Sequence, residues 1–297
     1  MGNDNGKMIA YKTAINPLEN TRALVVLEIP EDGKNNIQRT NIYDPNYARY
    51  RCDRAKVISI QDMETGEEIE GAISMFGVGG NNKILYLKGE TVVSDGYEKD
   101  PHVIFGKGIH FFLSEEPARH LRMNKPTDGL YKDWYDDGRI SMESFYKDGV
   151  LHGEYKSWHA NGIPEHRGIY THGLKHGTFE TWFDTGNLKS HYNYVKDHLH
   201  GECIEYYPNG YMQKLSTYDM QVLNGTQYEW YYTGKPSSTS NYKNGYKHGE
   251  YRSYHSNGFP MEESYFMFDK LHGERKLYDD TGKLISHRCY RNGFVCC

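Results

Sequence analysis

Histidine recurs at a fixed spacing in the second half of the chain, and its side chain can bind metals or transfer protons. The recurring residues are His152, His176, His200, His248 and His272. If each 24-residue repeat is a β-hairpin, equivalent histidines lie two strands, or about 9.6 Å, apart. That distance is too long for them to share one ion at about 2 Å. We therefore expect no metal site, and we expect the imidazoles to hydrogen-bond within the turns between repeats.

Neither carboxylates nor thiols form a catalytic pattern. The repeat residues Glu154, Glu202, Glu250 and Glu274 have no second carboxylate at a fixed spacing, so no general acid and base pair is predicted. The thiols are odd in number and lack paired CxxC spacing: Cys52, Cys203, Cys289, Cys296 and Cys297. We expect no disulfide framework, no cofactor and no catalytic residue, and so a protein that is not an enzyme.

The composition limits the classes of partner and compartment. A net charge of −5 without a cluster of Lys and Arg argues against nucleic acid as a partner. The amino terminus lacks the apolar stretch of a signal peptide, and no apolar run approaches the roughly 20 residues that span a bilayer. We expect a cytoplasmic protein that is neither secreted nor transmembrane. The 27 tyrosines and 31 glycines favour strands and turns.

Glycine defines the repeat. One series stands 24 residues apart without a slip: Gly129, Gly153, Gly177, Gly201, Gly225, Gly249 and Gly273. A second series, from Gly138 to Gly282, keeps the same spacing and marks a central turn in each unit. The repeats are 129–152, 153–176, 177–200, 201–224, 225–248, 249–272 and 273–297. Domain boundaries are placed at 1–124 for a small α+β domain and 125–297 for the repeats.

The turn chemistry sets the register of each hairpin. A three-residue turn puts Pro208 first, where its fixed φ suits a type I turn, and gives Gly210 the left-handed bulge position. In that register Trp134 pairs with Ile140. Because Tyr146 follows Ile140 by an even number of residues, we expect it on the same face as the Trp series. Small residues lie two positions before the late aromatics and leave room for rings: Ser144, Gly168, Ser216, Ser240 and Ser264.

The Trp series is expected to form the core face of the sheet. Trp182 should therefore be substantially buried, and Trp182→Ala should lower stability by about 3–5 kcal/mol. Seven hairpins at roughly 4.8 Å per strand extend too far for a small closed structure. The fold predicted is mainly β, with a small α+β domain followed by an elongated open antiparallel sheet of seven 24-residue hairpins.

Segments 153–158 (GEYKSW) and 249–254 (GEYRSY) carry a resemblance to a known family. They are similar to MORN repeats, the membrane occupation and recognition nexus family, in the variant form. The phase of the match holds from residue 128 to 297 through seven copies. The resemblance implies a single-layer antiparallel sheet and a role in attachment to proteins or membrane lipids.

The first 124 residues show no such period. Strands are predicted at 23–30, 56–60, 84–87 and 109–113, and a short helix is predicted after Ser114, whose side chain is expected to cap it. Segments 27–32, 51–57 and 108–112 resemble an uncharacterised domain found in giant DNA viruses, phages and some bacteria. That resemblance implies a viral source and carries no assigned activity.

Residues 105–111 (FGKGIHF) look like the GKGIYF segment of poly-ADP-ribose polymerases. In that segment the aromatic hydroxyl lies near nicotinamide, whereas this chain has His110 there and lacks an upstream His-Gly-Ser/Thr strand. A strand after a glycine turn explains the segment equally well. An ADP-ribosyltransferase-like or nucleotide-binding first domain is one alternative function. A second is membrane-surface attachment through the repeats or through lipid on Gly2, Cys296 and Cys297, residues that partly match lipidation patterns.

The leading hypothesis is a non-enzymatic scaffold that binds another protein. Alternation puts a second set of rings on the face opposite the Trp series, and a single-layer sheet cannot bury both faces by itself. Amphipathic tyrosine is enriched at interface hot spots. The candidate partner-binding residues are Tyr135, Tyr155, Phe183, Tyr207, Tyr231 and Tyr251.

Overall fold

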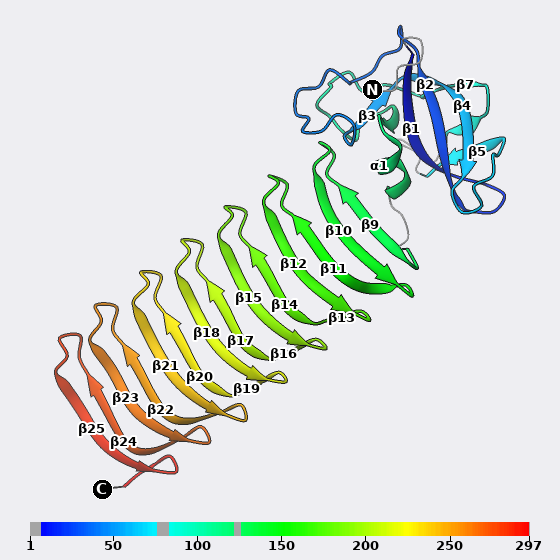
Figure 1. Cartoon of the computed structure of the whole chain (residues 1–297). Helices are drawn as coiled ribbons and strands as arrows, with labels where there is room; N and C mark the ends of the chain where they lie inside the picture. Colours follow the sequence, from blue (N-terminus) through cyan, green and yellow to red (C-terminus); the bar gives the residue numbers. More distant parts are fainter. Residues whose placement is uncertain (1–6, 76–82, 122–125, 297) are drawn as a thin grey trace. The chain divides into compact units, whose positions relative to one another are not determined.

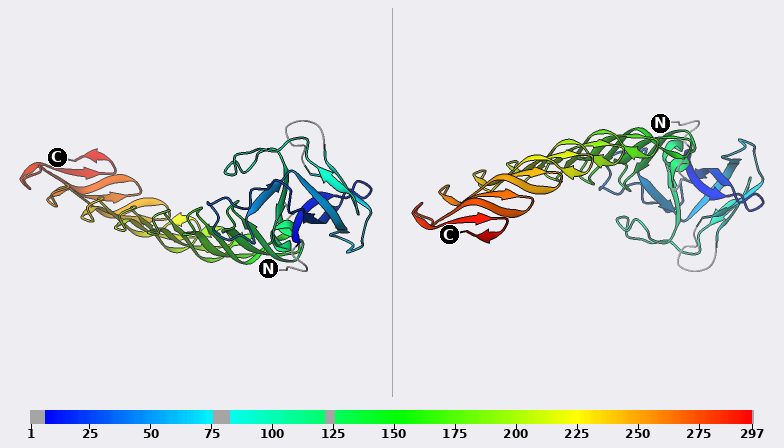
Figure 2. Two further views of the ribbon diagram at one scale, coloured as in Figure 1. Left: turned by 90° about the horizontal axis from the view of Figure 1, so that it is seen from above. Right: turned by 90° about the horizontal axis from the view of Figure 1, so that it is seen from below.

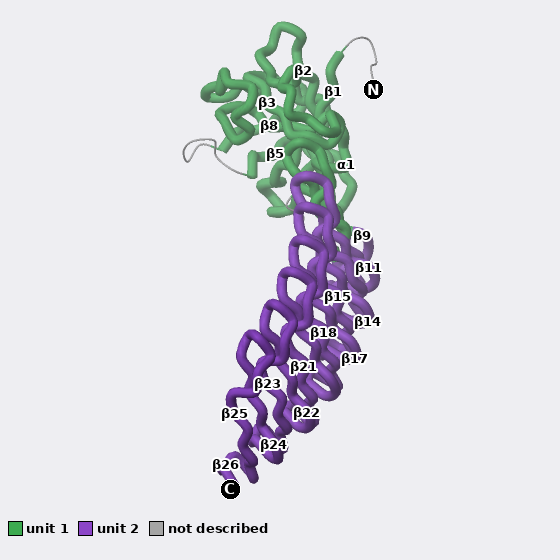
Figure 3. The backbone as a smooth tube through the Cα atoms, turned by 90° about the vertical axis from the view of Figure 1, so that its left-hand side faces the viewer, with its two compact units in different colours: residues 1–126, 131–143 green, residues 127–130, 144–297 purple. Residues whose placement is uncertain are grey.

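The computed structural model describes residues 7–75, 83–121 and 126–296. Figure 1 shows the whole chain, and Figure 3 its two compact units. The first unit comprises residues 1–126 and 131–143, and the second comprises residues 127–130 and 144–297. The central part of the first repeat's hairpin, residues 131–143, thus belongs to the first unit.

The first unit is built on one eight-stranded sheet in which every pairing is antiparallel. The order is β3-β8-β1-β2-β4-β7, while β5 pairs with both β1 and β6. The strands are β1 (Met8–Ile15), β2 (Arg22–Ile29), β3 (Arg49–Cys52), β4 (Arg54–Asp62), β5 (Gly71–Ser74), β6 (Leu85–Leu87), β7 (Thr91–Val93) and β8 (Ile109–Phe112). The four predicted strands correspond to β2, β4, β6 and β8.

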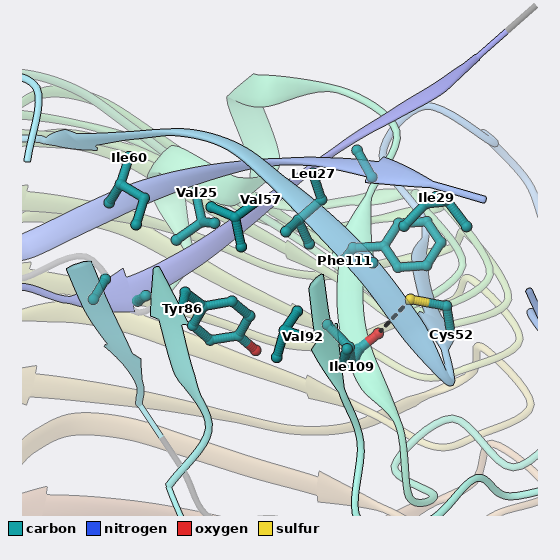
Figure 4. Packing of buried hydrophobic residues seen from close by; sticks show 14 of the residues in the cluster. Val25, Leu27, Ile29, Cys52, Val57, Ile60, Tyr86, Val92, Ile109 and Phe111 are labelled. Atoms are coloured by element: carbon teal, nitrogen blue, oxygen red, sulfur yellow. Dashed lines mark hydrogen bonds between the residues drawn. The ribbon is translucent and has the colours of Figure 1, made fainter. Parts of the chain in front are cut away.

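Alternation along these strands builds the core of the first unit. Val25, Leu27 and Ile29 on β2 point to one face and are buried with Val57 and Ile60 of β4. Figure 4 shows these side chains close to the rings of Tyr86 and Phe111. The inward row of β1 combines Ala10 and Ala14 with the partly buried Lys12, so its sequence lacks the apolar alternation that marks a strand.

A single short helix, α1 (Glu115–His120), occurs among the residues that the structure describes. The expected cap is wrong in detail, because the Ser114 side chain makes no capping hydrogen bond. Its hydroxyl instead donates to the Asn46 carbonyl oxygen at 2.8 Å. The regular structure of the predicted α+β domain is therefore mostly strand.

The hairpin of the first repeat packs within the first unit. Its Trp134 ring lies 5.2 Å from Tyr47 and 5.6 Å from His120, measured between ring centroids. The backbone oxygen of Asp136 accepts hydrogen bonds from the Arg39 side chain at 2.6 Å and from the Arg49 amide at 3.1 Å. These contacts hold the central turn of the first repeat against other residues of the same unit.

The repeats form a long antiparallel sheet, as predicted (Figure 1). Seen from other directions, its strands twist progressively along the array (Figure 2). The strands are β9 (Gly129–Trp134), β10 (Ile140–Lys147), β11 (Val150–Trp158), β12 (Pro164–Thr171), β13 (Leu174–Lys175), β14 (Gly177–Trp182), β15 (Leu188–Val195), β16 (His198–Leu199), β17 (Gly201–Tyr206), β18 (Met212–Asp219), β19 (Val222–Leu223), β20 (Gly225–Trp230), β21 (Pro236–Lys243), β22 (Tyr246–Tyr254), β23 (Pro260–Met267), β24 (Lys270–Tyr278), β25 (Leu284–Arg291) and β26 (Phe294–Val295).

The three-residue central turn is confirmed. The Gly210 amide donates to the Tyr207 oxygen at 2.9 Å, and the Tyr207 amide closes the loop on the Tyr211 oxygen at 2.8 Å. Gly210 has φ of 88°, the left-handed conformation that this position requires. The predicted cross-hairpin pairing recurs as Trp182 with Leu188.

The turns between hairpins have two central residues, both with positive φ, as in Met220 (45°) and Gln221 (72°). That combination is the type I′ turn, which favours Asn and Gly. At the second position the Gln221 side chain accepts a hydrogen bond from the Leu199 amide, 22 residues earlier, at 3.0 Å. The Gln221 amide also donates to the Leu199 oxygen at 2.7 Å, and because the equivalent backbone bond recurs in every repeat, each turn is held to the chain 22 residues earlier.

The predicted placement of the late aromatics is wrong. Ser157 pairs with His166 while Trp158 pairs with Pro164, so Glu165 is an extra residue in a β-bulge. A bulge reverses the alternation on one strand. Tyr170 therefore shares a face with Tyr155 and not with Trp158, and their ring centroids lie 5.9 Å apart.

Candidate binding face of the repeat sheet

The face opposite the Trp series is the more closely packed one, and we call it the ring face. From Tyr155 to Tyr194 its aromatic residues form a continuous row of edge-to-face contacts. Ring centroids are 5.9 Å apart for Tyr155 and Tyr170, 5.2 Å for Tyr170 and Phe179, and 5.3 Å for Phe179 and Tyr194. Such edge-to-face pairs are the favoured arrangement of aromatic quadrupoles. The row therefore holds its rings in fixed positions.

Small side chains fill the gaps between these rings. Ser144, Ser216, Ser240 and Ser264 are all buried. At the equivalent position, a Cβ added to Gly168 would lie 2.3 Å from a ring carbon of Phe179. This confirms that the small series makes room for neighbouring rings, although on the face opposite the Trp series.

Two lysines lie over rings of this face. The Lys175 ammonium is 5.1 Å from the Phe179 centroid and 5.0 Å from that of Tyr194. Lys247 is 4.7 Å from the Tyr251 centroid. All three distances are typical of cation–π contacts. The face thus combines aromatic surface with positive charge.

All six candidate partner-binding residues are partly exposed: Tyr135, Tyr155, Phe183, Tyr207, Tyr231 and Tyr251. Tyr135 belongs to the first unit and the other five to the second. Tyr155 and Tyr251 take part in the ring contacts with Tyr170 and Phe266. Their role in binding a partner stays a prediction.

Tyr207 and Tyr231 have a structural role that sequence reasoning missed. The Tyr207 hydroxyl donates to the Trp230 carbonyl oxygen at 2.9 Å, and the Tyr231 hydroxyl donates to the Tyr254 carbonyl oxygen at 2.5 Å. At the same repeat position, His159 Nε2 lies 3.0 Å from the Trp182 carbonyl oxygen. A side-chain donor at this position therefore joins one repeat to the backbone of the next. The signal was the recurrence of Tyr or His directly after the Trp series.

The Trp face is less buried than predicted. Trp182 is partly exposed, whereas Phe179 in the same repeat is 8% exposed. The expectation that Trp182 is a core residue is therefore wrong, because the bulge puts the late aromatics beside Phe179. A loss of 3–5 kcal/mol belongs to full burial of such a ring, so we expect a smaller loss for Trp182→Ala.

The recurring histidines lie at the turns between repeats. His200 Nδ1 is 3.4 Å from an Asp219 carboxylate oxygen, and His152 Nδ1 accepts a hydrogen bond from the His172 amide at 3.4 Å. Within residues 7–75, 83–121 and 126–296, no group of three or more His, Cys, Asp or Glu is placed to hold a metal ion. The absence of bound metal stays a prediction.

His110, in the segment that resembles poly-ADP-ribose polymerases, lies within the first unit. Burial, reinforced by nearby Lys12, lowers the pKa of His110 to about 4, so the ring is neutral at pH 7. Its Nε2 lies 3.1 Å from the Ile104 carbonyl oxygen and must carry the proton to donate to it. Lys12 Nζ donates to the backbone oxygen of His110 at 3.1 Å, and desolvation lowers the pKa of Lys12 to about 8. The imidazole thus positions the preceding loop.

The termini are only partly described. Gly2 and Cys297, two of the residues considered for lipidation, lie outside the described residues. Cys296 follows β26, with its Sγ 3.3 Å from that of Cys289. In the described part of the chain, no helix has the length and apolar character needed to cross a membrane.

Hairpins that pair in chain order and bind each other through turns and side chains define a β-hairpin repeat protein. The MORN repeat variant family matches residues 127–148, 151–172, 175–196, 199–220, 223–244, 247–266 and 271–292. Because these matches cover more than half of the chain, the protein belongs to the MORN repeat variant family. Residues 2–118 match a family of unknown function (DUF5758). No match was found among curated proteins.

Proposed function

We propose that the chain is a non-enzymatic scaffold whose ring face binds another protein. The observation that supports this most strongly is the packing of partly exposed rings on that face. Tyr155 belongs to a row that runs to Tyr194, and Tyr251 packs against Phe266. These rings are held in place by their neighbours and are still partly exposed. Rigid aromatic anchors lose little conformational entropy on binding, and Tyr is enriched at interface hot spots.

The charges on this face favour a protein over an anionic membrane. Lys175 and Lys247 are positive, but the same face carries Glu205 and Glu229, both partly exposed. A mixed surface suits electrostatic complementarity with a protein. An anionic bilayer instead attracts a cluster of positive charge without acidic residues. Liposome flotation with and without anionic lipid tests this choice: binding that requires anionic lipid would favour the membrane.

The first domain is proposed to have no enzymatic activity, since the His110 ring is committed to a backbone carbonyl. Calorimetry with NAD tests the alternative of nucleotide binding. A viral source is proposed as well, from the resemblance of the first domain. Locating the gene in a viral or a cellular genome tests this proposal, and a cellular location would contradict it.

The scaffold hypothesis is tested by crosslinking from one face at a time. A photoreactive phenylalanine analogue is placed at Tyr251, on the ring face, or at the adjacent Arg252, which points to the opposite face. Both proteins are expressed in cells that naturally produce the chain, and the cells are irradiated. The crosslinked partners are then identified by mass spectrometry. We expect one reproducible protein partner from position 251 and none from position 252.

The pair Tyr155 and Lys156 repeats the same comparison four repeats earlier. Equal crosslinking from both faces, or from Arg252 and Lys156 alone, would refute the assignment of the ring face. The substitutions Tyr155→Ser and Tyr251→Ser should weaken the same interaction, because they remove rings from the ring face. They leave in place the bonds between repeats that the hydroxyls of Tyr207 and Tyr231 make.

A further inference from the structure

Two cysteines face each other across the last hairpin. β25 pairs with β26 through Tyr290 opposite Val295, so the next residues outward, Cys289 and Cys296, are also opposite. The Cys296 amide donates to the Cys289 oxygen at 2.9 Å. Their Sγ atoms are 3.3 Å apart. Both side chains therefore lie on one face of the hairpin and point toward each other.

The backbone geometry permits a disulfide between them. A hydrogen-bonded antiparallel pair has Cα atoms about 5.5 Å apart, within the 4.4–6.8 Å range of disulfides. Small rotations about the side-chain bonds are enough to shorten the present separation of the sulfur atoms to a covalent bond. No movement of the strands is needed.

The two other described cysteines differ in their surroundings. Cys52 and Cys203 are buried, at 0% and 3% exposed. Burial raises the pKa of Cys52 to about 12 and also raises that of Cys203. Because the thiolate is the reactive form, both are poor nucleophiles. Cys289 is exposed and lines a shallow pocket of about 380 Å³ with His287 and Val295, so a small oxidant can reach it.

We propose that Cys289 and Cys296 form a reversible disulfide that closes the last hairpin. With hydrogen peroxide as oxidant, the Cys289 thiolate attacks one oxygen, the O–O bond breaks, and a sulfenic acid forms. The departing hydroxide takes up the proton that the thiol has lost and becomes water. The Cys296 thiolate then attacks the Cys289 sulfur, the S–O bond breaks, and a second water leaves. In total, two thiols are oxidised and one peroxide is reduced to two waters.

The disulfide would fix the end of the sheet. β26 has only two residues, and its Phe294 is 80% and Val295 58% exposed, so few contacts hold it. A covalent bond between Cys289 and Cys296 encloses the turn and holds β26 against β25. A reducing agent would release it again. A single reversible pair is compatible with the expectation that the chain has no disulfide framework.

Peptide mapping of the full-length protein tests the proposal. Trypsin cleaves after Arg288 and Arg291, which separates Cys289 from Cys296. After treatment with hydrogen peroxide, alkylation of free thiols and digestion without reductant, we expect peptides 289–291 and 292–297 to be linked. A reducing agent should separate them.

Serine variants identify the partner of Cys289. The link should persist in Cys297→Ser, the matched control, and disappear in Cys296→Ser. A link that persists in Cys296→Ser but not in Cys297→Ser would overturn the proposal. So would oxidation of Cys289 to sulfinic acid without any link.

Two further measurements complete the test. Unlabelled protein and ¹⁵N-labelled protein are mixed and then oxidised. We expect each linked pair of peptides to be either wholly labelled or wholly unlabelled. Pairs of one labelled and one unlabelled peptide would show a bond between two chains instead. Hydrogen exchange of the Cys296 amide should slow in the oxidised protein and recover after reduction. Unchanged exchange would overturn the proposed closure of the hairpin.

Discussion

Replacing Gly168 by alanine should destabilise the third repeat through the Phe179 ring. The added Cβ would lie 2.3, 2.4 and 2.6 Å from three carbons of that ring. Optimal carbon contacts are about 3.5–4.0 Å, so the ring must move by more than about 1 Å. Phe179 is 8% exposed and lies between Tyr170 and Tyr194, at 5.2 and 5.3 Å, and its movement would disturb both contacts.

Two effects of opposite sign determine the magnitude. Overpacking of this kind costs about 1–3 kcal/mol. Removal of glycine flexibility from the unfolded chain returns about 0.4–1 kcal/mol. The added Cβ would meet three carbons of a buried ring, so overpacking is the larger effect. We expect a net loss of about 1–2 kcal/mol. Gly168→Ser should be at least as unfavourable.

A neighbouring part of the sheet supplies the compensating pair. Two repeats later the equivalent residues are Ser216 and Gln227, and the serine hydroxyl donates to the glutamine oxygen at 3.3 Å. Gly168→Ser combined with Phe179→Gln copies this pair. The double variant should lose less stability than the sum of the two single variants, with a coupling of about 1 kcal/mol or more.

The parent, the three single variants and the double variant are compared by urea unfolding. Hydrogen exchange of peptides from β12 and β14 serves as a local probe, since repeat arrays need not unfold in one step. Stability of Gly168→Ala within about 0.3 kcal/mol of the parent would refute the argument from packing. Strict additivity in the double variant would refute it as well.

Three further predictions follow from single contacts. Tyr207→Phe removes the hydroxyl that donates to Trp230 and should lower stability by about 0.5–1.5 kcal/mol in urea unfolding, whereas an unchanged midpoint would show that this bond contributes nothing. Met220→Asn places a residue suited to positive φ at the first position of its turn and should raise stability by a few tenths to about 1 kcal/mol. A lower midpoint of urea unfolding would contradict this prediction. His110 has a folded pKa of about 4 against an ordinary 6.5, so the unfolded chain binds its proton first and stability should fall as the pH drops from about 6.5 toward 4. A His110→Gln variant should show a smaller fall over that range, and an equal fall would assign the effect to other groups.

Repeat phase and turn type could be predicted because they depend on local residues. Gly210 and Pro208 restrict the backbone at their own positions, and the three-residue turn follows from them without knowledge of distant contacts. The pairing of Trp182 with Leu188 then follows from the turn. Each of these predictions is confirmed.

The division of side chains between the two faces could not be predicted in the same way. One inserted residue on each returning strand reverses every later side chain. The inserted residue is Glu165 in one repeat, Lys189 in the next and Ile285 in the last, so no common residue type marks the bulge. Alternation counted from Ile140 to Tyr146 therefore gave the wrong face for the late aromatics.

The candidate binding residues show a related limit of sequence reasoning. Tyr155 and Tyr207 are the same residue type on the same predicted face, and both are partly exposed. The Tyr207 hydroxyl holds the backbone of the next repeat, whereas Tyr155 makes ring contacts with Tyr170. Which of two tyrosines is structural depends on a carbonyl oxygen 23 residues away in the chain.

This difference has a consequence for how the binding face is probed. Substitution of Tyr207 and Tyr231 by serine would remove two bonds between repeats, so weaker binding in that variant could reflect loss of structure. Tyr155 and Tyr251 make ring contacts with Tyr170 and Phe266, and their substitution leaves those two bonds in place. In a scaffold whose hairpins pair side by side in one sheet, binding can therefore be tested only at positions whose side chains do not also join the repeats.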